Sequence, residues 1–411
     1  MALQFLPLYI DPGTGSMLFS LFIGIAAAAT FGFRALFLKV KFLLSGGKKE
    51  GGSDSKTVSI VVFSDHKRYW NVFKPVCDEF ENHGVKILYL TQSKDDPALS
   101  QDYKFVETEF IGEGNKGFAK LNFLHADIVL ATTPGLDVYQ WKRSKFVKTY
   151  VHIPHSVSDL AGYRMFGLDH YDVVLGTGIN QLSSMRKIEE LRPSIKQKEF
   201  FAAGCTYLDA MKKRLDESPN TQKKGEKIVL VAPSWGKSSI LSKFGDEFLN
   251  ALKNTGYKVI VRPHPQSVVS EQHILKPLQE KYACFEWNYD NDNFEVLKNA
   301  DIMITDFSGV MFDYALVFDR PFIYADTNFD KSPYDIDWLE EPLWEMQILG
   351  KIGVQLKRED FSGIKSIIDK TIESTELEAA RNRIRDEAWE NRGKASSEVY
   401  RILMDILEKQ S

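Results

Sequence analysis

The sequence has few cysteines and little excess charge, and both scarcities narrow the classes of protein to which it can belong. Three cysteines occur among 411 residues, at Cys77, Cys205 and Cys284. They lie far apart and form no CxxC pair, so neither a disulfide framework nor a metal site follows from them. The formal net charge is −4, which gives no basic footprint for nucleic acid. We therefore expect reduced, buried cysteines in a cytosolic compartment, with no metal and no nucleic-acid partner.

Two common nucleotide-binding fingerprints are also missing. No GxGxxG follows the first predicted strand of either half of the chain, which argues against a dinucleotide enzyme. Lys237-Ser238-Ser239 lacks the GxxxxGK[ST] spacing of a Walker P-loop. The length nevertheless suggests two or three domains, and the composition is that of an ordinary globular protein.

The first 50 residues differ from the rest. Residues 17–33 are uncharged and about as short as a membrane-spanning helix can be, and Lys39, Lys41, Lys48 and Lys49 follow them. The preceding segment lacks the basic region of a signal peptide. The positive-inside rule then predicts a cell-membrane protein whose large C-terminal part faces the cytoplasm. A helix that lies on the membrane surface stays open as the alternative, so we expect single-pass or peripheral association.

Strand patterns rich in Val and Ile alternate with helical patterns in the rest of the chain. The first series of predicted strands covers 57–63, 85–90, 104–110, 127–131, 148–153 and 172–175, and the second covers 228–232, 257–261, 283–286, 301–304 and 321–324. Such alternation predicts parallel sheets that are covered by helices on both faces. The predicted fold class is α/β, with two tandem Rossmann-like doubly wound domains facing a cleft, preceded by an N-terminal membrane helix.

The predicted organisation has four parts. They are a membrane anchor with the start of a linker at 1–50, a first α/β domain at 57–205, a second α/β domain at 206–375, and a helical segment at 376–411 that packs back across the domains.

Residues 300–326 have the pattern of a strand, a turn, a helix and a second strand. The turn contains Asp306, Ser308 and Gly309, and it lies at the carboxyl end of a parallel strand, where open α/β sheets bind ligands. Amide groups at the Ser308-Gly309 corner would suit an anion such as phosphate. Ordinary helix capping by Asp306 and Ser308 explains the same residues equally well.

Three further corners carry polar residues at predicted strand ends. His155 follows the strand at 148–153, and Arg262 and His264 lie in the sequence Arg-Pro-His-Pro after the strand at 257–261. Ser234, Lys237 and Ser238 follow the strand at 228–232, and the last two are positioned to bind phosphate at a helix start. A doubly wound fold brings such corners to one edge of each sheet. Histidine titrates near neutrality, so His155 and His264 are candidate catalytic groups.

These corners resemble motifs of the CDP-glycerol glycerophosphotransferase family, which includes the teichoic-acid primases and polymerases. The resemblance rests on Ala-Pro-Ser-Trp at 232–235, Arg-Pro-His-Pro at 262–265, and Thr-Asp-Phe-Ser-Gly-Val-Met-Phe-Asp at 305–313 with Arg-Pro at 320–321. Residues 203–209 resemble a Gly-x-Pro-Arg-x-Asp corner of the family, and Gly-Lys-Ala-Ser at 393–396 resembles its C-terminal motif. The resemblance runs from about 145 to 400. It implies a GT-B fold whose two essential histidines fall on His155 and His264.

The resemblance also implies a function and its participants. A membrane-associated transferase would move glycerol phosphate or ribitol phosphate from a CDP-linked polyol donor to a hydroxyl of a lipid-linked or envelope glycan, with release of CMP and without a cofactor. The first domain would then face the acceptor and the second the donor, with Arg262, Asp306, Ser308, Gly309, Ser234, Lys237 and Ser238 as donor and phosphate contacts. A GT-B glycosyltransferase that uses a UDP- or GDP-sugar for surface polysaccharide synthesis is the alternative, and a non-catalytic membrane-tethered scaffold is a third hypothesis.

The sequence departs from the family pattern at several positions. Pro154-His155-Ser156 replaces Trp-His-Gly-x-Pro, Thr206-Tyr207 replaces Pro-Arg in the Gly-x-Pro-Arg-x-Asp corner, and Gly309 replaces a second serine. These departures leave the diphosphate interpretation intact, but they leave the identity of the polyol and of the acceptor open.

Overall fold

The computed structural model describes residues 58–164, 166–219, 225–290, 292–325, 336 and 338–410. These ranges belong to the compact unit formed by residues 57–411. The predicted membrane segment at 17–33 lies outside the described residues. Within the described ranges, no helix combines the length and the apolar character that a membrane crossing requires.

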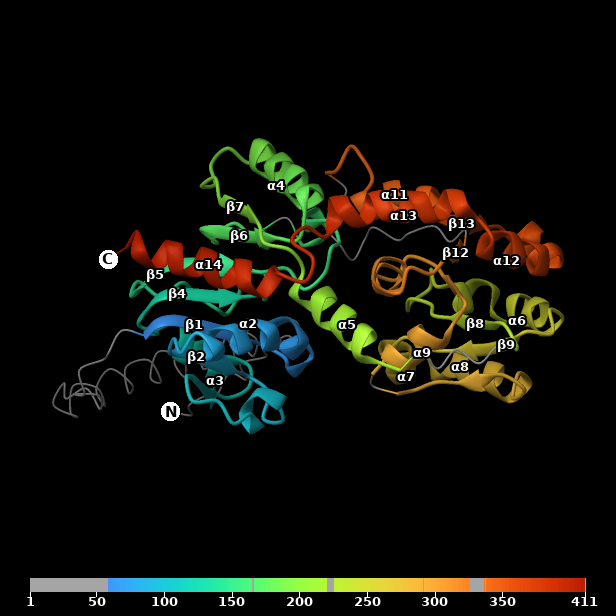
Figure 1. Cartoon of the computed structure of the whole chain (residues 1–411), viewed down its shortest axis with the longest axis horizontal. Helices are drawn as coiled ribbons and strands as arrows, with labels where there is room; N and C mark the ends of the chain where they lie inside the picture. Colours follow the sequence, from blue (N-terminus) through green and yellow to red (C-terminus); the bar gives the residue numbers. More distant parts are fainter. Residues whose placement is uncertain are drawn as a thin grey trace, which may run out of the picture. The chain divides into compact units, whose positions relative to one another are not determined.

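The first sheet of the described chain has seven parallel strands in the order β3-β2-β1-β4-β5-β6-β7 (Figure 1). Its interior strand β1 is fully buried from Ile60 to Phe63 because helices cover both faces of the sheet. The strands are β1 (Val58–Ser64), β2 (Ile87–Thr91), β3 (Val106–Phe110), β4 (Ala126–Ala131), β5 (Val147–His152), β6 (Val173–Gly176) and β7 (Glu199–Ala202).

The second sheet has six parallel strands in the described residues, in the order β10-β9-β8-β11-β12-β13. Its strands are β8 (Ile228–Val231), β9 (Lys258–Val261), β10 (Glu286–Trp287), β11 (Ile302–Thr305), β12 (Phe322–Ala325) and β13 (Gly353–Leu356). The prediction of an α/β fold with parallel sheets is therefore confirmed. The exact domain boundaries stay a prediction.

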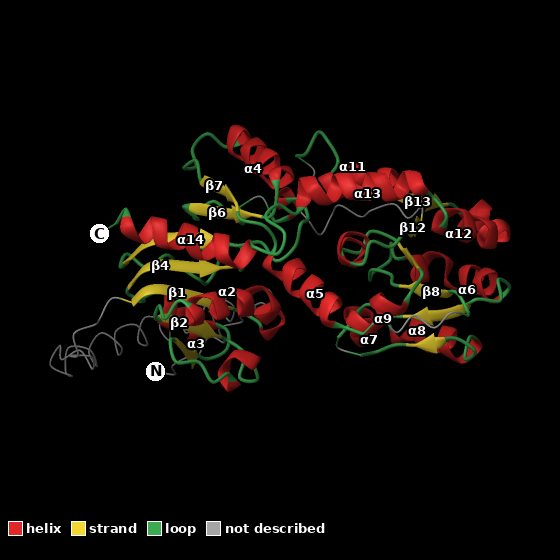
Figure 2. Cartoon of the chain, in the orientation of Figure 1, coloured by secondary structure: helices red, strands yellow, loops and turns green. Residues whose placement is uncertain are grey.

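Helices alternate with the strands in both halves (Figure 2). Around the first sheet they are α2 (Trp70–Asn82), α3 (Asn115–Leu121), α4 (Ile179–Leu191) and α5 (Thr206–Glu217), with 3₁₀ turns η1 (Lys67–Tyr69), η2 (Pro97–Ser100) and η3 (Leu160–Gly162). Around the second they are α6 (Ile240–Lys253), α7 (Pro265–Ser270), α8 (Gln272–Lys281), α9 (Phe294–Asn299), α10 (Val310–Phe312), α11 (Trp344–Ile352) and α12 (Ile364–Ile372), with the π-helical turn η4 (Asp313–Val317) and the 3₁₀ turn η5 (Arg358–Gly363).

The C-terminal segment is divided between the two halves. Helix α13 (Thr375–Ala388) contributes Ile384 to a core built mainly from the second sheet, whereas α14 (Ala395–Glu408) contributes Leu403 to the core of the first. Between them, Asp209 of α5 accepts hydrogen bonds from the backbone amides of Gly393 and Ala395 at 2.8 and 2.9 Å. Two motifs of the family resemblance thus form one joint between the helices.

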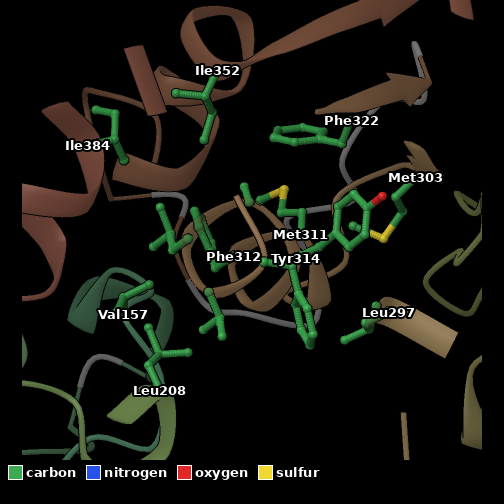
Figure 3. Packing of buried hydrophobic residues seen from close by; sticks show 14 of the residues in the cluster. Val157, Leu208, Leu297, Met303, Met311, Phe312, Tyr314, Phe322, Ile352 and Ile384 are labelled. Atoms are coloured by element: carbon green, nitrogen blue, oxygen red, sulfur yellow. The ribbon is translucent and has the colours of Figure 1, made fainter. Parts of the chain in front are cut away.

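One hydrophobic core contains residues that reach it from both halves. Figure 3 shows Met311, Phe312 and Tyr314 of the segment after β11 packed together, with Val157 and Leu208 at the same core. Val157 follows β5 of the first sheet by five residues. The loop that carries His155 is therefore anchored in a core that the second sheet shares.

Candidate functional site

A cavity of about 770 Å³ lies at the carboxyl ends of strands from both sheets. His155 and His264 both line it, although the two residues come from different sheets. Other lining residues follow β1, β8, β9 and β11 or lie on α5: Arg68, Tyr69, Pro233, Arg262, Ser308, Gly309, Asp313 and Tyr207. The structure therefore brings the two candidate histidines to one cavity, as the sequence predicted.

His155 lies among aromatic rings just beyond the carboxyl end of β5 in the first sheet. Its imidazole lies 5.2 Å from the ring of Tyr69 and 6.5 Å from that of Tyr163, measured between centroids. Burial lowers the pKa of His155 below its ordinary value, and Arg68 lowers it further while Asp65 opposes the shift. A neutral imidazole is the form that can accept a proton.

Buried amides hold the loop that follows His155. The Nε2 of Gln181 donates to the carbonyl oxygens of Ser156 and Ser158 at 3.0 and 2.8 Å. The Nδ2 of Asn180 donates to the carbonyl oxygen of Val157 at 2.9 Å. Because Asn180 and Gln181 are buried in the first turn of α4, the His155 loop has a fixed backbone.

A reciprocal pair of hydrogen bonds joins the same loop to the second half of the chain. The amide of Asp159 donates to Oε2 of Glu345 at 3.0 Å, and the amide of Trp344 donates to Oδ2 of Asp159 at 2.9 Å. We call Asp159, Trp344 and Glu345 the inter-sheet clasp. Burial raises the pKa of Glu345 to about 7, and the nearby Asp159 carboxylate adds to the rise.

His264 caps helix α7 with its own side chain. Its Nδ1 accepts a hydrogen bond from the amide of Gln266 at 3.1 Å. The neutral ring therefore carries its proton on Nε2, which is left to donate. Burial lowers the pKa of His264, while Asp306 and Glu271 raise it. The indole of Trp235, which is 51% exposed, stacks on this imidazole at 6.4 Å between centroids.

Arg262 is a cation that lines the cavity from the end of β9 in the second sheet. Its guanidinium donates to Oδ1 of Asn288 and, at 2.7 Å, to the carbonyl oxygen of Asp290. Both partners are neutral acceptors, so they orient the guanidinium group without forming an ion pair with it. Burial lowers the pKa of Arg262, against the influence of Asp290 and Asp292.

Asp306 does not line the cavity, because its carboxylate is directed into the protein. Oδ1 accepts from the amide of Ser234 at 2.9 Å and from that of Phe307 at 2.7 Å, and Oδ2 accepts from the amide of Ile240 at 3.0 Å. Burial raises the pKa of Asp306, whereas these hydrogen bonds oppose the rise. Asp306 thus fixes the end of β11 to the β8–α6 loop and to the first amide of α6, and a direct contact with the donor stays a prediction.

The other predicted phosphate contacts divide into two groups. Ser308 and Gly309 line the cavity, whereas Ser234, Lys237 and Ser238 do not. Ser234 is buried, Lys237 is exposed, and the helix that follows is capped by Ser239, whose Oγ accepts from the amide of Ser242. The helix after Gly309 is also shorter than predicted, since α10 ends at Phe312 and gives way to a π-helical turn.

The sequence left Arg68 open between an acceptor contact and a solvated turn, and Tyr69 and Tyr207 were not predicted from it. Arg68 and Tyr69 line the cavity from the segment after β1, and Tyr207 lines it from α5. His155 was selected because it follows a predicted parallel strand. Arg68 and Tyr69 follow β1 in the same way, so the same rule, applied to β1, points to them. His152 is fully buried, and burial lowers its pKa to about 3, as expected for a histidine packed inside the sheet. No three His, Cys, Asp or Glu side chains in the described ranges are grouped closely enough to hold a metal ion.

Solved structures with a similar fold come from envelope-polymer and sugar-nucleotide enzymes. The wall teichoic acid polymerase TagF aligns with a TM-score of 0.59 at 16% identity, covering 92% of this chain and 98% of that one. The UDP-GlcNAc 2-epimerase of Neisseria meningitidis aligns with a TM-score of 0.51 at 14% identity, covering 85% and 100%. At such low identity these similarities establish the fold alone.

Two curated proteins are similar in sequence. The teichoic acid poly(glycerol phosphate) polymerase of Bacillus spizizenii is 36% identical over 100 residues, covering 22% of this chain and 24% of the relative. The minor teichoic acid biosynthesis protein GgaB of Bacillus subtilis is 26% identical over 234 residues, covering 50% and 24%. The chain thus spans about a quarter of the length of each curated relative.

The match to a protein family is broader. Residues 195–404, just over half of the chain, match the family described as CDP-Glycerol:Poly(glycerophosphate) glycerophosphotransferase. This range includes Arg262, His264, Ser308 and Asp313, which line the cavity. The chain belongs to the CDP-glycerol:poly(glycerophosphate) glycerophosphotransferase family.

Proposed function

We propose that the protein transfers a polyol phosphate, either glycerol phosphate or ribitol phosphate, from a CDP-linked donor to a hydroxyl group of a lipid-linked or envelope glycan, with release of CMP. The observation that carries this proposal is that His155, His264 and Arg262 line one cavity. Membership of the family and the names of the two curated relatives support the same chemistry.

The reaction is an in-line displacement at phosphorus. The acceptor oxygen forms a bond to the phosphorus next to the polyol, the bond from that phosphorus to the CMP oxygen breaks, and the hydroxyl proton passes to a base. Such a transfer needs a positioned base and donors around the phosphate oxygens. Residues with these properties come from both sides of the cavity.

We assign the base to His155 and the stabilising role to His264. The pKa of His155 is lowered by burial, so its neutral ring is available to take the hydroxyl proton. His264 uses Nδ1 to accept from Gln266, so its Nε2–H is a donor suited to the phosphate that leaves with CMP. Arg262 supplies positive charge to the same diphosphate, and Ser308 and Gly309 supply neutral donors.

We further propose that the fold is of the GT-B type and that the protein works at the membrane. The uncharged run at 17–33, followed by lysines, motivates a position at the cell membrane with the residues of the cavity on the cytoplasmic side. Sedimentation of the full chain with liposomes, compared with a variant lacking residues 1–50, tests this part, and equal sedimentation of the two would contradict it.

The function is tested by presenting separate donors to the purified full chain with membrane extract. We expect the protein to release CMP from CDP-glycerol or CDP-ribitol. We expect no release of UDP or GDP above background from UDP- or GDP-sugars. Release of UDP or GDP instead would favour the sugar transferase. A chain that releases nothing and binds neither CDP nor CMP in calorimetry would favour the scaffold.

A further inference from the structure

Buried polar side-chain atoms without a hydrogen-bond partner occur at the carboxyl ends of three adjacent strands, β1, β4 and β5. They are Oδ1 of Asp65 after β1, Oγ1 of Thr132 and of Thr133 after β4, and, at and after the end of β5, both ring nitrogens of His152 and Nδ1 of His155. An unpaired buried polar atom costs about 1–3 kcal/mol, so such groups in a folded protein point to a functional use.

Two of these atoms are chemically complementary. Oδ1 of Asp65 accepts hydrogen bonds, and Nδ1 of His155 donates one whenever it carries the ring proton. The segment after β1 packs against the imidazole, since the ring of Tyr69 lies 5.2 Å from it. The field of the Asp65 carboxylate reaches His155 and raises its pKa, against burial and the charge of Arg68.

We propose that Asp65 is a positioning residue for His155, whose Nδ1–H donates to the carboxylate of Asp65 when donor and acceptor occupy the cavity. This inference rests on the function proposed above. Catalytic hydrogen bonds are often long in ligand-free enzymes and shorten in the substrate complex. With its proton held on Nδ1, the imidazole presents the lone pair of Nε2 to the acceptor hydroxyl. The carboxylate then stabilises the imidazolium that forms.

The groups around His155 determine how its pKa changes when the charge of Asp65 is removed. The charged and titratable groups near it on the first sheet are Asp65, Arg68 and Tyr69 from the β1–α2 segment, His152 from β5 and Tyr163 after η3. From the rest of the chain, Asp159 and Glu345 line one pocket with His155, and Arg262, His264 and Asp313 line the cavity with it. Burial lowers the pKa of His152 to about 3, so His152 stays neutral near pH 7. Removal of the Asp65 charge therefore leaves Arg68 and burial unopposed, and the pKa of His155 falls.

The kinetic test compares Asp65→Asn with Asp95→Asn. Asp95 is an exposed carboxylate paired with Lys67, so its removal leaves His155 untouched. We expect Asp65→Asn to lower kcat at least about tenfold, with KM for the CDP-linked donor nearly unchanged, because an imidazole in the wrong tautomer cannot take the acceptor proton at Nε2. The acid limb of its kcat/KM profile moves to lower pH. Wild-type kcat and an unshifted profile in Asp65→Asn would overturn the inference.

A spectroscopic test separates this inference from the proposed function. In the full chain labelled with ¹⁵N-histidine, the His155 signals are identified by their loss in His155→Gln. We expect the wild-type ring to carry its proton on Nδ1 with CDP-glycerol bound, and Asp65→Asn to lower the titration midpoint without substrate. A wild-type ring protonated on Nε2 overturns the inference even where Asp65→Asn does not fold. Absence of CMP release from wild type contradicts only the transferase proposal.

Discussion

The hydroxyl of Tyr207 donates a 2.9 Å hydrogen bond to Oδ2 of Asp313, and both residues line the cavity that contains His155 and His264. Tyr207 lies on α5, between the two sheets in the chain (Figure 1), whereas Asp313 follows β11. Burial raises the pKa of Asp313 to about 7, although the Tyr207 hydroxyl opposes the rise. A carboxyl group that titrates near neutrality thus faces the proposed donor site.

The first prediction concerns the stability contributed by Asp313. An aspartate has an ordinary pKa of 3.8, and burial raises that of Asp313 to about 7, so the folded state holds a proton that the unfolded state releases within this window. The unfolding free energy therefore falls as pH rises from about 4 to 7. Asp313→Asn removes this loss, so we expect the variant to gain about 4 kcal/mol relative to wild type between pH 4 and pH 8.

Urea unfolding of both proteins at the two pH values measures this difference. Tyr207→Phe is the matched variant, because it keeps the carboxyl group and removes its donor, which raises the pKa of Asp313 further. A stability difference between Asp313→Asn and wild type that is the same at pH 4 and pH 8 would refute the prediction.

The second prediction concerns the inter-sheet clasp. Glu345→Gln keeps an oxygen that accepts from the amide of Asp159 and removes a buried charge, so we expect it to be neutral or stabilising at pH 8. Glu345→Ala leaves the amide of Asp159 without its acceptor, and we expect a loss of about 1–3 kcal/mol. Chemical denaturation of the two variants at pH 8 separates charge from hydrogen bonding. Equal stability of both variants would show that the hydrogen bond from Asp159 to Glu345 contributes nothing.

The third prediction assigns Asp306 to stability. Its carboxylate accepts from three backbone amides, so Asp306→Ala leaves buried donors unpaired and we expect a loss of roughly 3 kcal/mol or more. Asp386→Asn removes an exposed carboxylate paired with Arg392 and is expected to change stability by less than about 1 kcal/mol. Thermal unfolding compares the two. A fully stable Asp306→Ala protein with weakened CDP binding would favour the donor contact instead.

The fourth prediction concerns donor binding by Arg262. Its guanidinium is oriented by Asn288 and by the carbonyl of Asp290, so Arg262→Gln removes a prearranged cation from the cavity. We expect the Kd for CDP to rise at least about tenfold, or about 1.4 kcal/mol. Arg358→Gln, which removes an exposed arginine paired with Glu247, is the control and leaves the Kd unchanged. Calorimetric titration provides both values, and equal affinities would exclude Arg262 from the donor site.

The sequence predicted the parts of the site that follow from local pattern. The strand ends before His155 and His264 are apolar runs followed by corners that contain proline, and a doubly wound fold places such corners at the carboxyl edge of each sheet. Strands β7 and β13 were not predicted, because neither is a continuous apolar run. The sequence pattern also did not predict that the helix after Gly309 changes to a π-helical turn.

The local sequence pattern did not predict the directions in which side chains at the site point. Asp306 has the sequence context of a cap or a ligand contact, yet its acceptor capacity is used by Ser234 and Ile240, which lie more than sixty residues earlier in the chain. The proton position on His264 likewise depends on the amide of Gln266, which only the folded turn brings within reach. Such choices depend on tertiary partners, which a single strand-end motif does not specify.

The most direct test of the account is CMP release by the full chain and by His155→Ala and His264→Ala, with CDP-glycerol and CDP-ribitol as donors and membrane extract as acceptor. A positioned base contributes about 10²–10⁴-fold, so we expect turnover in each variant to fall at least about a hundredfold while circular dichroism shows an unchanged fold. Wild-type turnover in either folded variant would contradict the assignment of that histidine to the reaction.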